Sequence, residues 1–156
     1  MVKLNKNLLA PCGLYCGVCA IYIADRDNNL KFKERLVDVY KPYSKTIGDV
    51  KCSGCLSENK ENIFEYCKIC PIRDCVKRKE IEGCYQCDNF PCKFIERFPI
   101  PVGKKVILRA IPRWREIGTK NWVEEEKKRY HCPACGNRLF RGAKRCNKCG
   151  INVDVD

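Results

Sequence analysis

The stretch from Cys52 to Cys92 constrains this chain most, because it contains eight of the 15 cysteines. The eight are Cys52, Cys55, Cys67, Cys70, Cys75, Cys84, Cys87 and Cys92. Three pairs have CxxC spacing, which lets a tight turn direct both sulfurs at one metal ion. The stretch has too few large apolar residues to fold on a hydrophobic core alone, whereas one structural zinc supplies about 10 kcal/mol or more of folding free energy. We therefore predict metal binding.

Disulfide bonding is the main alternative for a chain this rich in cysteine. Two features of the sequence count against it. The opening, Met1 to Cys12, has only one short apolar run, Leu8-Leu9-Ala10, which is too short for a signal peptide. The cysteines also cluster as CxxC rather than being widely spaced. From these two features we expect a cytoplasmic protein with metal-bound thiols. No stretch is long and apolar enough to span a membrane.

The formal charge of +12 overstates how basic the metal-bound protein would be. One zinc held by four thiolates contributes a net charge of −2, so about three such sites would halve the excess. The remaining positive charge is uneven, since residues 93–130 hold eleven basic and five acidic side chains. If the protein has a face that binds a polyanion, we expect that face in residues 93–130.

Three cysteines near the N-terminus, Cys12, Cys16 and Cys19, have CxxxCxxC spacing. This spacing is similar to the cluster motif of radical S-adenosylmethionine enzymes, in which three thiolates hold three irons and one iron stays open. Those enzymes need a large βα barrel, and this chain has neither the length nor repeated βα units for one. A structural metal with three of its ligands here is the favoured interpretation, and an iron–sulfur cluster is the alternative.

Helical patterns occur between the cysteine groups. Residues 29–40 place Phe32, Leu36 and Val39, followed by Tyr43, at the spacing of one buried face. Two shorter helices are expected at 71–80, where Pro71 occupies the first turn, and at 93–98.

Four motifs taken together, APCGLYCGVC, CSGC, CPIRDC and CYQCDNFPC, resemble those of an uncharacterised prokaryotic family, domain of unknown function 3795. The resemblance covers roughly residues 8–100. It implies metal binding and ten family positions: Cys12, Cys16, Cys19, Cys52, Cys55, Cys70, Cys75, Cys84, Cys87 and Cys92. The family has no established activity, so the resemblance implies no particular function.

Residues 101–130 contain no cysteine and read as a helical connector. Pro112 is expected to kink or divide the helix, and Asn121 with Glu124 resembles a capping box for a second helix. Trp114 and Trp122 are expected to be core anchors. The basic residues Lys105, Arg109 and Arg113 recur every four positions. They form either a strip that contacts phosphates or a solvated helix face, and the solvated face is the favoured interpretation.

The C-terminal segment contains two knuckles of the form CxxCG, ten residues apart. Their cysteines, Cys132, Cys135, Cys146 and Cys149, have the spacing of a zinc ribbon. His131 adjoins Cys132 and is expected to be a flank rather than a ligand. Basic residues in this segment add candidates for nucleic-acid binding: Arg141, Lys144 and Arg145.

Counting ligands leaves eleven cysteines outside the ribbon, which is not a multiple of four. Chain order suggests two closed sites, Cys52/Cys55/Cys67/Cys70 and Cys75/Cys84/Cys87/Cys92. The N-terminal triplet is then one ligand short. A ligand other than cysteine, interleaved sites with spare thiols, or a functional open position would each explain the shortfall.

The function predicted from these patterns is that of a non-catalytic, zinc-binding module that docks a protein or a nucleic acid, with a protein partner slightly favoured and no membrane. The single histidine excludes the usual Ser-His and Cys-His nucleophile pairs. The alternative is an iron–sulfur or thiol-redox enzyme that uses Cys12, Cys16 and Cys19. The predicted fold is a small α+β, metal-stabilised protein. It would comprise a treble-clef-like cysteine-rich domain (1–100), a basic helical connector (101–130) and a zinc ribbon (131–156).

Overall fold

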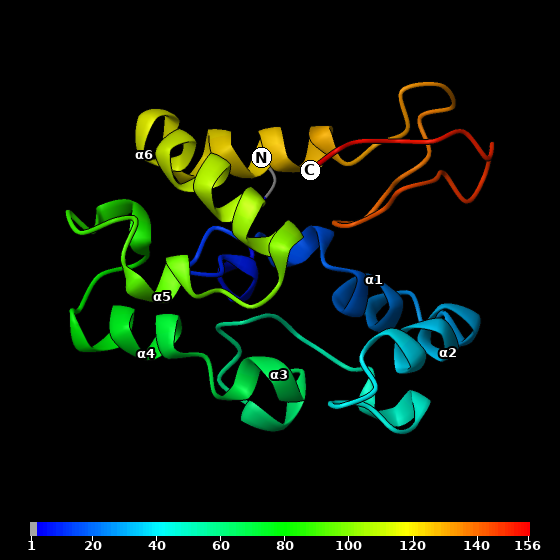
Figure 1. Ribbon diagram of the computed structural model, residues 1–156, viewed down its shortest axis with the longest axis horizontal. Coiled ribbons are helices and arrows are strands. Elements are labelled where there is room, and N and C mark those ends of the chain that lie inside the picture. The colour runs from blue at the N-terminus through cyan, green and yellow to red at the C-terminus, as the bar shows by residue number, and fades with distance from the viewer. Residues whose placement is uncertain (1–2) are drawn as a thin grey trace.

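The computed structural model of this chain describes residues 3–156, so the first two residues of the Met1 to Cys12 opening lie outside it. The described chain is mostly helical (Figure 1). Its α-helices are α1 (Ala20–Arg26), α2 (Leu30–Val39), α3 (Glu65–Lys68), α4 (Pro71–Arg78), α5 (Lys93–Glu96) and α6 (Pro101–Arg129). Short 3-10 turns connect several of them. Across residues 3–156, none of the helices combines the length and the apolar composition needed to cross a bilayer.

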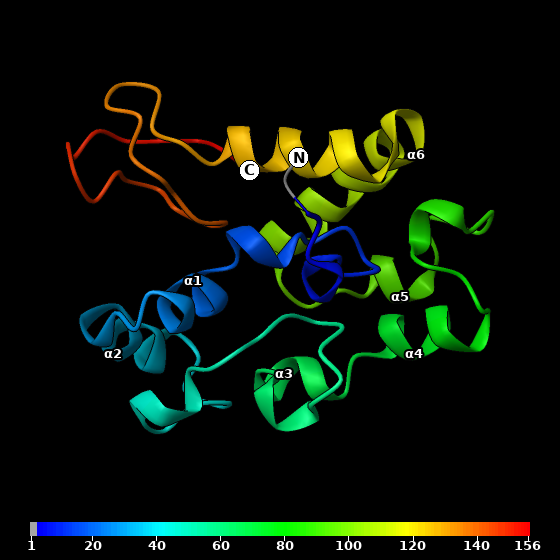
Figure 2. The ribbon, with the colours of Figure 1, turned by 180° about the vertical axis from the view of Figure 1, so that it is seen from behind.

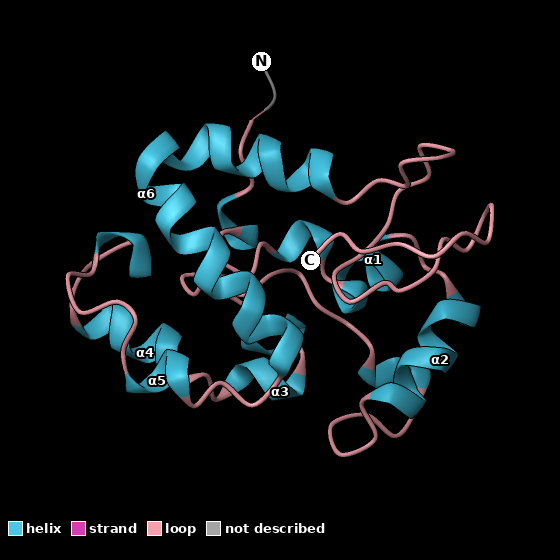
Figure 3. Cartoon of the chain, turned by 45° about the horizontal axis from the view of Figure 1, so that its top comes forward, coloured by secondary structure: helices cyan, strands magenta, loops and turns pink. Residues whose placement is uncertain are grey.

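Extended structure in residues 3–156 is limited to two isolated antiparallel bridges, His131 with Arg138 and Arg145 with Asn152. The expected α+β, treble-clef-like fold is therefore not confirmed, and the protein is better described as a helical structure with a loop-rich C-terminal segment (Figure 3). The reason is compositional, because the cysteine-rich stretches turn too often to leave room for strands.

The N-terminal segment lies in the middle of the molecule. Seen from both sides, it runs between α6 and the layer that contains α3 and α4 (Figures 1 and 2). The helices α1 and α2 pack at one end, and α4 and α5 lie at the other. This central position is what brings the N-terminal cysteines close to cysteines from later in the chain.

Helix α6 is a hairpin of two arms (Figure 3). Its turn is at Gly118 rather than at the expected Pro112. Gly118 has φ 78° and ψ 165°, a conformation that glycine adopts without steric cost. Pro112 lies inside the first arm. Asn121 does not start a new helix as a capping residue, since its side-chain amide donates to the carbonyl of Ile117 at 3.0 Å. The tertiary contacts between the arms therefore decide where the chain turns.

The two arms of α6 are joined by ion pairs. The Arg109 Nη1 lies 2.5 Å from the Glu126 carboxylate, which is 2% exposed, and Arg113 pairs with both Glu125 and Glu116. The hydrogen bonds that Arg113 donates to Glu125 and, with a smaller effect, to Glu116 raise the pKa of its guanidinium. The stripe of positive charge predicted from the sequence is thus partly neutralised within the hairpin.

Replacing Glu126 with alanine should destabilise the protein by about 3 kcal/mol, because Arg109 would lose the buried partner of its charge. Urea unfolding followed by circular dichroism would measure the change. The matched control is Glu124→Ala on the same arm. Glu124 is 47% exposed and lies 4.0 Å from Lys127, so its loss should cost less than about 1 kcal/mol. Equal effects of the two changes would contradict a special role for the buried pair.

The main core contains Trp114 and Trp122, which confirms both as core anchors. They are 1% and 0% exposed, and their rings stack with centroids 3.9 Å apart at an angle of 6°. Tyr85, from the Cys84/Cys87 knuckle, stacks on the other side of Trp114 with a centroid distance of 4.3 Å. The Arg115 Nε also donates to the Tyr85 carbonyl at 2.8 Å. The α6 hairpin therefore holds part of the cysteine-rich segment in place.

The helix expected at residues 29–40 is confirmed as α2, and the Asn29 side chain caps it by accepting from the Phe32 N–H at 3.0 Å. Its predicted buried face is only partly right. Leu36 is 4% exposed, but Val39 is 70% and Tyr43 is 41% exposed. Helix α1, which the sequence pattern did not predict, packs against the apolar face of α2.

Candidate metal centres

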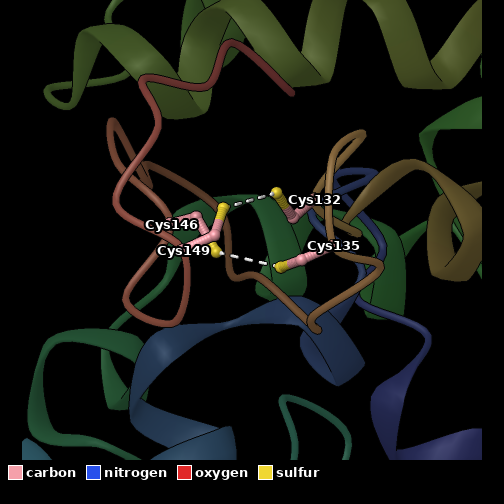
Figure 4. A group of neighbouring side chains, drawn as sticks. All are labelled: Cys132, Cys135, Cys146 and Cys149. Atoms are coloured by element: carbon pink, nitrogen blue, oxygen red, sulfur yellow. Dashed lines mark hydrogen bonds between the residues drawn. The ribbon is translucent and has the colours of Figure 1, made fainter.

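The C-terminal segment brings four thiols together at the spacing of a single metal ion (Figure 4). The sulfurs of Cys132, Cys135, Cys146 and Cys149 all lie within 4.8 Å of one another. The Cys132 and Cys149 sulfurs are 3.6 Å apart, and those of Cys135 and Cys146 are 3.7 Å apart. A tetrahedral ion with metal–sulfur bonds of about 2.3 Å places its sulfurs about 3.8 Å apart. We name this group of four thiols the C-terminal cluster.

The backbone of each knuckle shapes the C-terminal cluster. Gly136 and Gly150 have φ of 72° and 80°, which lets the chain turn directly after the second cysteine of each knuckle. Their N–H groups donate to the carbonyls of Cys132 and Cys146 at 2.9 and 3.0 Å. Hydrogen bonds from the Cys149 and Lys148 N–H groups lower the pKa of the Cys146 thiol to about 6, which favours the thiolate that a metal needs.

The C-terminal segment is attached to the rest of the protein through Arg141 and Asp156. The Arg141 guanidinium donates to the Tyr15 carbonyl at 3.1 Å, and its backbone N–H donates to the Val18 carbonyl at 2.8 Å. The Asp156 carboxylate accepts from the hydroxyl of Tyr130, at the end of α6, and from the Gly142 N–H within the segment, both at 3.1 Å. These contacts place the segment against the N-terminal cysteines.

A central cavity of about 430 Å³ is lined by seven cysteines from three separate segments. They are Cys12, Cys16, Cys19, Cys52, Cys55, Cys67 and Cys70. The first three are the N-terminal triplet, and the other four are the closed site suggested by chain order. The structure thus brings to one cavity two groups that chain order kept apart, and the triplet no longer stands alone.

The sulfurs of the central cavity receive hydrogen bonds from the backbone. The Cys55 N–H donates to the Cys16 sulfur at 3.4 Å, and the Gly54 N–H donates to the Cys52 sulfur at 3.4 Å. Gly54 has φ of 111°, and a Cβ at this position would lie 2.3 Å from the Asn7 carbonyl oxygen. Only glycine therefore allows the turn that directs these N–H groups at sulfur.

Burial strongly affects the thiols of the central cavity. Burial raises the pKa of Cys12, Cys16 and Cys67 above the ordinary value, and the neighbouring thiols raise it further. Burial, followed by the charge of the nearby Cys70, raises the pKa of Cys55 to about 11. Thiolates in this cavity therefore require cations beside them. Two cationic side chains, Arg97 and Arg141, also line the cavity.

A second cavity, of about 200 Å³, is lined by the other four predicted ligands: Cys75, Cys84, Cys87 and Cys92. Burial, followed by Cys92, raises the pKa of Cys84 to about 12. The Lys79 ammonium donates to the Cys87 sulfur at 3.3 Å. The grouping of these four cysteines by chain order therefore corresponds to one location in the structure.

The six basic residues suggested for nucleic-acid binding have different environments. Arg109 and Arg113 pair with glutamates, Arg141 lines the central cavity, and the Arg145 Nε donates to the Gly150 carbonyl at 2.8 Å. Lys105 is exposed and lies 3.9 Å from an Asp154 carboxylate oxygen. Lys144 is exposed as well.

Sequence reasoning missed one basic cleft, which has a volume of about 350 Å³. Its lining includes Lys3, Arg26, Lys127 and Arg138, together with Tyr22. These residues are far apart in the chain, and no local pattern joins them. Arg26 is also paired with Asp27 at 2.7 Å, which reduces the positive charge available there.

Comparison with known protein families identifies one matching family, described as a protein of unknown function (DUF3795), over residues 8–97. The chain belongs to the DUF3795 family. No curated protein and no solved structure matches the chain. The matched region contains all cysteines of the central and second cavities, whereas the C-terminal cluster lies outside it. The family assignment confirms the predicted resemblance and adds no activity.

Proposed function

We propose that this DUF3795 protein is a non-catalytic, zinc-binding docking module whose C-terminal segment is a zinc ribbon. The observation that carries the proposal is the C-terminal cluster, whose sulfurs already have the spacing of one tetrahedral ion. Four thiolates in tetrahedral geometry are typical of structural zinc. A closed site of this kind holds a fold together and leaves no coordination position for a substrate.

A protein is the favoured partner. Two of the six basic candidates are neutralised by glutamates, and Arg141 faces the central cavity, so a continuous phosphate-binding strip has little support. The exposed residues of the ribbon have mixed character, since Lys144 and Lys148 are exposed and Ile151 is 38% exposed. An exposed surface that combines polar and apolar residues suits a protein interface. The CxxC pattern and the free cysteines further support a cytoplasmic location.

Binding measurements at low and moderate salt separate the two kinds of partner. We expect mixed-sequence RNA and DNA to bind weakly, with a salt slope that does not change when Arg109 and Arg113 are replaced by alanine. A protein partner found by cross-linking, then purified, should bind the doubly substituted Lys144→Glu, Lys148→Glu chain roughly tenfold more weakly. Lys60→Glu, exposed and outside the ribbon, is the control. Tight, steeply salt-dependent nucleic-acid binding would overturn the choice of a protein partner.

A further inference from the structure

The seven thiols of the central cavity are arranged differently from those of the C-terminal cluster. Among residues 3–156, only the C-terminal cluster brings three or more ligand atoms within 4.8 Å of one another. The central cavity has more thiols in its lining, around a space of about 430 Å³, yet no three of their sulfurs lie within 4.8 Å of one another. A zinc ion occupies less space than one water molecule, whose share of liquid volume is about 30 Å³. A single ion would leave most of this space unfilled.

We propose that the central cavity binds an iron–sulfur cluster, with ligands drawn from the seven cysteines that line it. In such a cluster, inorganic sulfide bridges the irons, so the protein thiolates attach at the periphery instead of meeting at one ion. Thiols spread around a cavity match that arrangement. This inference concerns a site that is separate from the ribbon and does not depend on the proposed docking function.

The surroundings of the thiols also suit an iron–sulfur cluster. N–H groups from Cys55 and Gly54 donate to the sulfurs of Cys16 and Cys52, and such bonds stabilise cluster sulfur. Arg141 supplies a positive charge beside the anionic cluster. The lining is otherwise rich in apolar side chains, including Phe64 and Ile72, which would shelter the cluster from water.

The ligand bonds form by simple exchange. Each cysteine thiol that binds loses its proton to solvent and gains a bond from sulfur to iron. Two ferrous ions, two ferric ions and four sulfide ions together make a [4Fe–4S] core of charge 2+. Assembly from that mixture therefore needs no additional oxidant or reductant.

The test is metal and sulfide analysis of the full chain. The chain is purified without oxygen and then incubated with sulfide and with equal amounts of ferrous and ferric iron. We expect about four irons and four acid-labile sulfides per chain, with broad absorbance at about 400 nm. Cys16→Ser combined with Cys55→Ser should remove most of the iron and sulfide. Cys149→Ser, in the ribbon, should lose zinc and keep the iron, which separates this proposal from the proposed function.

Two results would overturn the assignment. About three zinc ions per chain with no sulfide, in the unmodified protein, would mean that the cavity takes zinc. Because this measurement uses the unmodified protein, it does not depend on whether the double variant folds. Iron and sulfide that survive in a folded Cys16→Ser, Cys55→Ser chain, but disappear in Cys84→Ser, would assign the cluster to the second cavity instead.

Discussion

Replacing Cys146 with serine is expected to unfold the C-terminal segment, residues 131–156, while α6 remains helical. This segment has only two isolated bridges as regular structure, so we expect a metal ion bound at the C-terminal cluster to provide much of its folding free energy. A structural zinc contributes about 10–16 kcal/mol at neutral pH. Zinc content should fall by about one ion per chain. Hydrogen exchange of backbone amides in residues 131–156 should accelerate by several orders of magnitude.

Unfolding of the C-terminal segment should also destabilise the main core, because Leu139, Val153 and Val155 of this segment belong to that core. We therefore expect a lower melting temperature for the whole chain, and not only for the segment. Lys148→Ala is the control, since it changes an exposed residue of the same knuckle and removes no ligand. Unchanged protection of residues 131–156 in Cys146→Ser would show that packing, rather than metal, stabilises the C-terminal segment.

Replacing Trp114 with alanine is expected to destabilise the protein by about 3–5 kcal/mol, the usual loss when a large aromatic side chain leaves a core. Trp114 is 1% exposed and lies between Tyr85 and Trp122 in a stack of three rings. Its Nε1 also donates to the Thr119 hydroxyl at 2.9 Å, beside the turn at Gly118. The substitution therefore weakens both the α6 hairpin and its contact with the Cys84/Cys87 knuckle.

Urea unfolding of Trp114→Ala and of Leu108→Ala, compared at equal metal content, would measure this effect. Leu108 lies on the same arm of α6 but is 42% exposed, so its replacement should cost about 1 kcal/mol or less. Similar losses for the two variants would show that the stacked rings contribute no more than a partly exposed residue.

Local patterns in the sequence predicted the local features of this structure well. The C-terminal cluster follows from two knuckles, each of which needs only four residues and a glycine to form its turn. Helices α2 and α4 follow from a capping asparagine, a proline in the first turn and apolar spacing. In each case the residues that determine the structure are close neighbours in the chain.

Features that depend on distant contacts were not predictable in the same way. The turn of α6 was expected at Pro112, but it occurs at Gly118, because there the two arms can stack their tryptophans and pair Arg109 with Glu126. The apolar spacing of α2 predicts that Val39 is buried, but Val39 is exposed in the structure. The sequence did not show that α1 would cover this helix.

The sequence by itself determined that the thiols of this protein occur in groups, and it identified two sets of four cysteines, the C-terminal cluster and the set at the second cavity. Only the tertiary structure decided that the N-terminal triplet shares a cavity with Cys52, Cys55, Cys67 and Cys70. The physical reason is the path of the chain. A CxxC turn fixes two sulfurs locally, whereas joining three such segments requires the core to hold the N-terminal segment at the centre.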